Sequence, residues 1–562
     1  MGVPPRKGLP GTDDGGRGCM KPPKSIELDA KQMQELKERV AAGALQEGDH
    51  KILEAVITTY LFFSRLLEAK NTSIKRLRRL LFGNKTEKAE KVLDNADKKS
   101  SDSDEPPGDD TKPTGGAGGK KPKGKRKKRK GHGRNGADAY TGAERVKIPH
   151  QNLRHGDHCP LCPGGKIYLL KESGVIVRLR GSAPITATVY EPEKLRCNLC
   201  GEVFTAQAPE EAGEDKYDES SKAMIALLKY GTGMPFNRLE NLQAALGIPL
   251  ASSTQWDQVE QIGNAAHPVF NELMNQAAQG DIVYNDDTTN RVLDLIKENQ
   301  TKNDDERTGI FTTGIVSTTD AVKIAIFHTG RRHAGENLNA LLEKRDAQKN
   351  PPIQMADALT RNVPQDFKTI LCNCNAHARR NFVDVTWCFP DECRYVIKAM
   401  GKVYKHDEIA RQENMFPHQR LAYHQENSGP VMDDLKCWLE AQFEEKLVEP
   451  NSGLGKAIQY MLNHWKELTA FLKVPGAPID NNLCERCLKR VILNRKNSLF
   501  FKSEFGAYMG DMFMSLIHTC SLMRVNPFDY LIALQKYASN VFKNPAQWMP
   551  WNFQETIAST GA

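Results

Sequence analysis

The sequence predicts a multidomain protein of the α+β class, and three observations support this prediction. The chain has 562 residues, more than one hydrophobic core usually holds, and 39% of them are hydrophobic, which is enough for several cores. Short apolar runs at residues 281–289, 309–316 and 322–328 have the composition of strands. Residues 433–445 instead space their apolar side chains as an amphipathic helix does.

The first predicted element after a disordered N-terminus (1–25) is a helical segment at 26–83. Its apolar residues recur every seven positions, as a coiled coil requires. They are Leu53, Tyr60, Leu67, Ile74 and Leu81, with Val56, Phe63 and Leu77 at the partner positions. A coiled coil would make the protein a homo-oligomer. A single amphipathic helix packed on its own chain has the same pattern, so both interpretations remain open.

Residues 84–145 are predicted to form a disordered basic linker, because they are rich in Lys, Asp, Gly and Pro and poor in large apolar residues. Residues 120–130 hold nine basic side chains, and the rest of the chain has 69 basic against 70 acidic residues. Such a run attracts DNA phosphates regardless of base sequence. A linker that only keeps the protein soluble is the alternative. The expected DNA-binding residues are Lys125, Arg126, Lys127, Lys128, Arg129 and Lys130.

A zinc-binding module is predicted at 146–212. Cys159 and Cys162 form one Cys-x-x-Cys pair, and Cys197 and Cys200 form a second after a strand-like stretch. Four thiolates complete a tetrahedral zinc site, so one structural Zn²⁺ is expected in a zinc-ribbon-like fold. Reduced cysteines without a metal are the alternative. Thirteen cysteines in a chain without a signal peptide indicate a reducing cytoplasm rather than a secreted disulfide protein.

Residues 213–279 are predicted to be helical, with the spacing of a helix-turn-helix. Gly247 would make the turn, and a second helix would carry Thr254, Gln255 and Gln258. Polar side chains on such a helix can contact base edges in the major groove. Ordinary packing of these helices against the core is equally compatible with the sequence.

Three acidic positions are candidate catalytic residues. The strand at 281–289 contains Asp286 and Asp287, a second apolar run delivers Asp357, and a helix predicted to begin at about residue 480 carries Glu485. Neighbouring strand residues point to opposite faces, so only one of the first two acids can join the others. The cations around the glutamate are Arg486, Lys489, Arg490, Arg495 and Lys496. An acid in such surroundings suits a divalent cation beside a phosphodiester, although caps and surface ion pairs are the usual roles of such residues.

Short motifs around these acids resemble the insertion-sequence 66 family of bacterial DDE transposases. The resemblance is carried by residues 284–288 at the first acid, 374–382 with a Cys-x-x-His-x-Arg-Arg pattern, and 480–497 with Asp-Asn-Asn-x-x-Glu-Arg. It extends from about Leu53 to the C-terminus. The sequence departs from the family at Ala358, where the family has Tyr after the second acid. The family places the first ligand at Asp286 rather than at its neighbour.

The resemblance implies an RNase H-like α/β core in two parts, 280–390 and 475–525. A helical insertion at 391–474 separates them, and a helical segment at 526–562 ends the chain. Further thiols at Cys372, Cys374, Cys484 and Cys487 lie in this core and are expected to be buried rather than metal-bound.

The activity implied by the family is that of a DNA transposase acting on the terminal repeats of an insertion sequence. Asp286, Asp357 and Glu485 would hold two Mg²⁺ or Mn²⁺ ions, water would free a 3′-hydroxyl, and that hydroxyl would attack target DNA. The expected phosphate contacts are His377, Arg379, Arg380, Arg486, Arg495 and Lys496. Partners would be double-stranded DNA, further copies of the chain and small accessory proteins. A nuclease without strand transfer and a catalytically silent, zinc-containing DNA-binding protein are the alternatives.

A membrane protein is not expected. The longest apolar stretch, residues 55–63, is too short and too polar to span a bilayer, and the chain begins without an apolar signal region. A bacterial cytoplasmic location is therefore predicted.

Overall fold

The computed structural model describes residues 39–40, 49–50, 52–53, 154–158, 165–166, 168, 182–196, 203–213, 215–303 and 306–560. Nearly all of the predicted coiled coil, the basic linker and the four cysteines of the predicted zinc site therefore lie outside the described residues. Among the described residues, Arg379–Gly401 and Glu445–Ala457 belong to one compact unit, and most of the others belong to a second unit. No helix of the described chain is long and apolar enough to cross a membrane.

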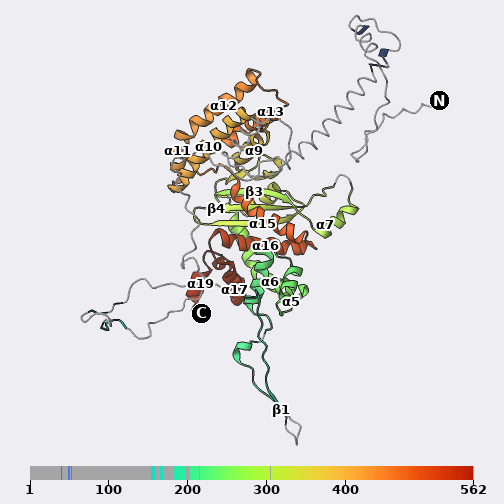
Figure 1. Ribbon diagram of the computed structural model, residues 1–562, viewed down its shortest axis with the longest axis vertical. Coiled ribbons are helices and arrows are strands. Elements are labelled where there is room, and N and C mark those ends of the chain that lie inside the picture. Colours follow the sequence, from blue (N-terminus) through green and yellow to red (C-terminus); the bar gives the residue numbers. More distant parts are fainter. Residues whose placement is uncertain are drawn as a thin grey trace, which may run out of the picture. The chain divides into compact units, whose positions relative to one another are not determined.

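A five-stranded mixed sheet forms the centre of the larger unit (Figure 1). Its strands, in spatial order, are β5 (Lys323–Gly330), β4 (Phe311–Thr318), β3 (Ile282–Thr289), β6 (Ile353–Ala356) and β7 (Ile370–Asn373). The first three pair antiparallel, whereas β3, β6 and β7 pair parallel. The predicted strands are thus present, and the α+β class is confirmed.

A small two-stranded antiparallel sheet precedes this core and consists of β1 (Lys194–Arg196) and β2 (Val203–Thr205). The helices up to the insertion are α4 (Glu219–Ala226), α5 (Phe236–Ala245), α6 (Ser252–Ala277), α7 (Leu293–Glu298), α8 (Ala334–Leu342) and α9 (Asn375–Val385). Short turns of other helix types are η2 (Glu210–Ala212), η3 (Leu227–Gly231), η4 (Asn299–Thr301) and η5 (Thr360–Asn362).

Helices also fill the stretch between the second and third acids, as expected for an insertion. They are α10 (Pro390–Gln412), α11 (Pro417–Asn427), α12 (Gly429–Glu444), α13 (Gly453–Asn463), α14 (Trp465–Leu468) and η6 (Ala470–Leu472). The C-terminal elements are α15 (Asn482–Ser498), α16 (Glu504–Leu522), α17 (Pro527–Lys536), α18 (Ala538–Lys543), η7 (Pro545–Trp548) and α19 (Phe553–Thr560). In the smaller unit, Val385 packs against Gly453. A Cβ atom added at Gly453 would lie only 3.0 Å from Val385 Cγ1, so a larger residue there would crowd this contact.

The two faces of the sheet are covered by different helices. On one face, Gly314 of β4 has no side chain, and Leu488 of α15 packs so closely there that a Cβ would lie 2.9 Å from its Cδ2. Figure 1 shows α15 and α16 beside β3 and β4. The neighbouring Thr313 points to the other face, where its Oγ1 accepts a hydrogen bond of 2.7 Å from Asn337 of α8. Phe270 of α6, Phe327 of β5 and Phe513 of α16 share one hydrophobic core.

The edge strand β5 is protected by three side chains of α16. Asp511, Ser515 and Thr519 accept hydrogen bonds from the backbone N–H groups of Thr329, Phe327 and Ala325, at 2.6, 3.0 and 3.1 Å. The three side chains are four residues apart on α16, which is a rise of about 6 Å along the helix. The three N–H groups are two residues apart on β5, which is a rise of about 6.6 Å along the strand, so the two spacings match. These bonds remove the unpaired edge that would otherwise pair with another chain.

Replacement of Ser515 by Ala is expected to lower the free energy of unfolding by about 1–3 kcal/mol, because the N–H of Phe327 would lose its acceptor in a buried position. Urea denaturation followed by circular dichroism measures this change. Ser521→Ala is the control, since Ser521 is exposed at the C-terminal end of the same helix. Equal destabilisation by both substitutions would contradict the assigned role of Ser515.

The helices α5 and α6 do not present the predicted base-reading residues. Gln255 is fully buried, and its Nε2 donates to the carbonyl oxygens of Phe236 at 3.1 Å and Leu250 at 3.0 Å. Gln258 is also buried, whereas Thr254 is half-buried. The prediction that Gln255 and Gln258 contact base edges is therefore wrong, because α6 packs one whole side into the hydrophobic core. The alternative, ordinary helix packing, describes these two residues correctly.

Candidate active site

Asp286 occupies β3 near its C-terminal end, where the strand passes between β4 and β6. Its Oδ1 accepts a hydrogen bond of 2.8 Å from the backbone N–H of Asp287. Burial raises the pKa of Asp286 to about 7, and repulsion from Asp357 and Glu485 adds to the increase. Asp357 and Glu485, from distant parts of the sequence, therefore lie near enough to Asp286 for their charges to act on its carboxylate.

Asp357 follows directly on β6, the parallel neighbour of β3. The register pairs Tyr284 with Met355, so two residues further along both strands Asp286 and Asp357 reach the same level. The side chain of Asp357 is fixed by η5, because Asn362 Nδ2 donates a hydrogen bond to its Oδ1 and the Leu359 N–H approaches the same atom at 3.4 Å. The end of β6 and the following turn thus hold the second acid beside the first.

Glu485 lies in the first turn of α15, and the residues before it dock this helix onto the sheet. Asn481 Nδ2 donates to the carbonyl oxygen of Asn285 on β3 at 3.1 Å. Asp480 accepts from the backbone and the side chain of Asn482, at 3.1 and 2.6 Å. The Asp-Asn-Asn motif thereby docks the start of α15 onto β3, and Glu485 lies near enough to Asp286 to contribute to its raised pKa. The predicted helix start at about residue 480 was early by two residues, since Asn481 is the N-cap and α15 begins at Asn482.

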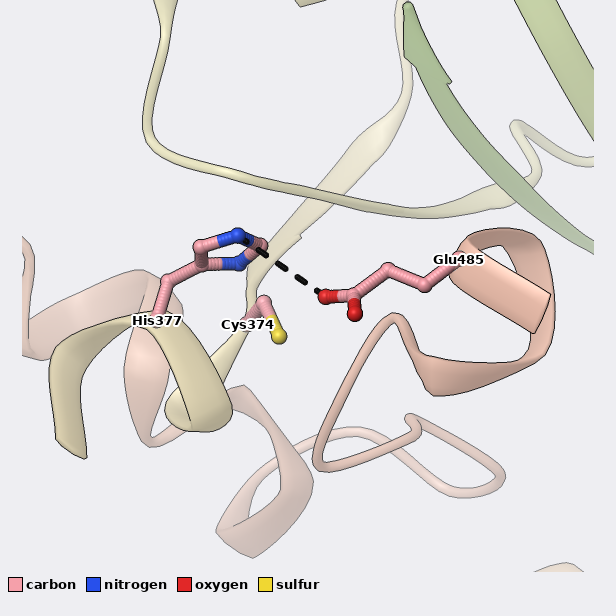
Figure 2. Close-up of side chains that lie close together, drawn as sticks. All are labelled: Cys374, His377 and Glu485. Atoms are coloured by element: carbon pink, nitrogen blue, oxygen red, sulfur yellow. Dashed lines mark ion pairs between the residues drawn. The ribbon is translucent and has the colours of Figure 1, made fainter. Parts of the chain in front are cut away.

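Cys374 and His377 approach the same glutamate from the start of α9 (Figure 2). One possible ligand atom from each of these three side chains lies within 4.8 Å of the other two. His377 Nε2 is 3.8 Å from Glu485 Oε1. Cys374 is fully buried, as predicted for the core thiols, and burial raises its pKa to about 11. The sequence interpretation missed this cluster, although the Cys-x-x-His spacing at the start of a helix was a usable signal.

Asp287 points to the opposite face of the sheet from Asp286. Its carboxylate contacts His333 Nδ1 at 2.8 Å and Arg361 Nη2 at 3.4 Å, and its side chain is only 3% exposed. His333 and Arg361 line a cavity of about 490 Å³ beside α8. The structure therefore separates the two neighbouring aspartates, with Asp286 near Asp357 and Glu485 and Asp287 in a different set of contacts.

The predicted phosphate contacts occupy different environments. Arg486 and Lys496 are exposed on α15. Arg495 instead ties the same helix to the end of β3, where its Nη1 donates to Thr289 Oγ1 at 3.0 Å and approaches Thr288 Oγ1 at 3.3 Å. Arg379 and Arg380 follow His377 on α9 but belong to the smaller unit. Arg495 therefore has a structural role that the sequence did not reveal.

Comparison with known proteins places this architecture in a family. The chain matches the family described as Transposase IS66 family over residues 216–509, slightly more than half its length and including all three acids. The protein therefore belongs to the IS66 transposase family. It is 28% identical to the uncharacterized protein y4hP of Sinorhizobium fredii over 428 residues, which are 72% of this chain and 74% of that protein. It is also 32% identical to the uncharacterized protein y4jD of the same organism over 188 residues, 33% of this chain and 36% of the relative.

Proposed function

We propose that the protein is the DNA transposase of an insertion sequence, which binds the terminal repeats, cleaves a strand at each end and joins the 3′-hydroxyl to target DNA. The observation that carries the proposal is the convergence of Asp286, Asp357 and Glu485, from two parallel strands and one helix start. The strand order β5-β4-β3-β6-β7 supports an RNase H-like core, in which acids at the ends of the central strands form the catalytic centre. Membership of a transposase family supports the same activity.

The donor set of this site fits divalent cations. Neither Asp286 nor Asp357 forms an ion pair with Lys or Arg within residues 215–303 and 306–560, and Glu485 has only His377 at ion-pair distance there. Three crowded carboxylates without a balancing cation suit Mg²⁺ or Mn²⁺, which prefer oxygen ligands. Bound in pairs, such ions polarise a phosphodiester and activate the attacking oxygen.

The residues around the acids position them for this chemistry. Asn362 orients the carboxylate of Asp357, and Asn481 fixes the start of α15 to β3. Gly314 admits Leu488, so that α15 lies directly on the sheet. A centre held by strands and a docked helix keeps its geometry better than one built on loops.

The proposal extends to parts of the chain outside the described residues. It includes one structural Zn²⁺ at Cys159, Cys162, Cys197 and Cys200, and DNA attraction by the basic run at 120–130. Several copies of the protein would assemble through the heptad segment at 26–83 and hold the two ends of the element together. This assembly would take place in the bacterial cytoplasm.

End cleavage and joining in vitro test the proposed function. Purified protein, with any companion proteins encoded by the element, is mixed with labelled DNA that carries both element ends and with plasmid target. We expect nicked ends and joined products with Mg²⁺ or Mn²⁺, and neither product with EDTA. Cleavage without joined products would make the protein a nuclease. Absence of both reactions from folded, DNA-bound protein would contradict the proposal.

A further inference from the structure

We propose that Cys374, His377 and Glu485 form a binding site for Zn²⁺ that overlaps the carboxylate centre and competes with it for Glu485. The three ligand atoms lie within 4.8 Å of one another. In a tetrahedral site with Zn–S of about 2.3 Å and Zn–N and Zn–O of about 2.0 Å, neighbouring ligand atoms are about 3.5 Å apart. Small rotations of the three side chains would bring their ligand atoms from within 4.8 Å of one another to the separation of about 3.5 Å that zinc requires. Figure 2 shows the thiol, the imidazole and the carboxylate gathered around one point.

Unsatisfied polar atoms point to a missing partner in this cluster. Glu485 Oε1 and His377 Nδ1 are buried and have no hydrogen-bond partner within the described part of the chain. The distance of 3.8 Å between His377 Nε2 and Glu485 Oε1 is too long for a hydrogen bond between them. Buried polar atoms of native proteins nearly always have a partner, and a cation bound in the cluster would provide one for Glu485 Oε1.

The backbone around the cluster holds its ligands in place. Asn375, between the cysteine and the histidine, donates from its Nδ2 to the carbonyl oxygens of Leu468 at 2.9 Å and Ile479 at 3.2 Å. The backbone N–H of Asn481 donates to Cys374 Sγ at 3.2 Å, which links the start of α9 to the start of α15. These contacts bring the two ligand-bearing helix starts together without a metal, so the site is preorganised.

The donor types select the cation. A thiolate, an imidazole and a carboxylate are the ligands of zinc, whereas the oxygen-only set of Asp286, Asp357 and Glu485 suits Mg²⁺. Since one carboxylate belongs to both sets, Zn²⁺ at the Cys-His-Glu site withdraws Glu485 from the centre that the proposed transposase activity requires. Free zinc is then an inhibitor of this enzyme, and that consequence rests on the proposed function.

Zinc stoichiometry of the full-length protein tests the binding site without any activity measurement. After dialysis against buffered micromolar Zn²⁺, elemental analysis should show one equivalent less in Cys374→Ala than in the wild type. Cys372→Ala is the matched control, because Cys372 is equally buried but outside the cluster, and it should retain the wild-type content. His377→Ala should also lose one equivalent, and its 24% exposed side chain makes misfolding of this variant a smaller concern. Wild-type zinc content in folded His377→Ala would overturn the proposal.

A separate experiment measures whether Zn²⁺ at this site competes with the carboxylate centre for Glu485. The rate of end cleavage is compared with and without added Zn²⁺ at constant Mg²⁺. The zinc concentration that halves the rate should increase at least about tenfold in Cys374→Ala, a change that corresponds to one lost ligand. An unchanged value would refute the competition. If the wild type binds this zinc but cleaves no DNA, the proposed function fails while the site stands; if it cleaves DNA and lacks this zinc, only the site fails.

Discussion

Asp286→Asn is expected to lower the rate of end cleavage on the order of 10³-fold, because a metal-binding charge worth several kcal/mol in the transition state is removed. The amide keeps the size of the side chain and can still accept the hydrogen bond from the Asp287 N–H, so the fold should be unaffected. Cleavage of labelled end DNA in Mg²⁺ gives the rate, and circular dichroism checks folding.

Asp287→Asn is the natural control for this substitution, since the two residues are neighbours on the same strand. Asp287 faces His333 and Arg361 instead of the other acids, so its replacement should reduce cleavage about tenfold or less, through altered packing beside the 490 Å³ cavity. An inactive Asp287→Asn beside an active Asp286→Asn would reverse the assignment of the two faces of β3.

Glu485→Gln is expected to lower the rate of end cleavage as much as Asp286→Asn does. Glu485 is the acid that α15 contributes to the proposed centre. Loss of its charge leaves the two strand carboxylates with an incomplete ligand set. Single-turnover cleavage in Mg²⁺ measures the change, and DNA binding in Ca²⁺ should remain close to that of the wild type.

Glu504→Gln is the matched control for the helix position. Glu504 also lies in the first turn of a helix, but it is exposed and belongs to α16 rather than to α15, which carries Glu485. Its replacement should leave the cleavage rate within about twofold of the wild type, as for an ordinary surface substitution. Similar losses in both variants would show that the effect of Glu485→Gln comes from helix stability rather than from the site.

Much of the central sheet could be predicted because its strands are marked by local composition. The runs at 281–289, 309–316 and 322–328 became β3, β4 and β5 with shifts of a few residues at their ends. The opposite orientation of Asp286 and Asp287 follows from the period of two in any strand. The helix that carries Glu485 was also predictable, since an Asp-Asn-Asn sequence favours a helix start.

Contacts between distant segments could not be predicted in this way. Gln255 and Gln258 have polar side chains on a helix, but their burial depends on which side of α6 faces the core. The Cys374–His377–Glu485 cluster joins residues more than 100 positions apart, and Asn481 connects them through bonds to Cys374 and β3. These interactions arise only once the sheet and helices have assembled.

The cleavage rate of Asp357→Asn in Mg²⁺ tests the central claim most directly, because Asp357 is the acid whose surroundings depart most from the family motif. The structure places it level with Asp286 across the parallel pair β3–β6 and fixes it through Asn362. We therefore predict a loss on the order of 10³-fold with DNA binding retained, as for the other two acids. Cleavage by Asp357→Asn at the wild-type rate would contradict a catalytic centre formed by Asp286, Asp357 and Glu485.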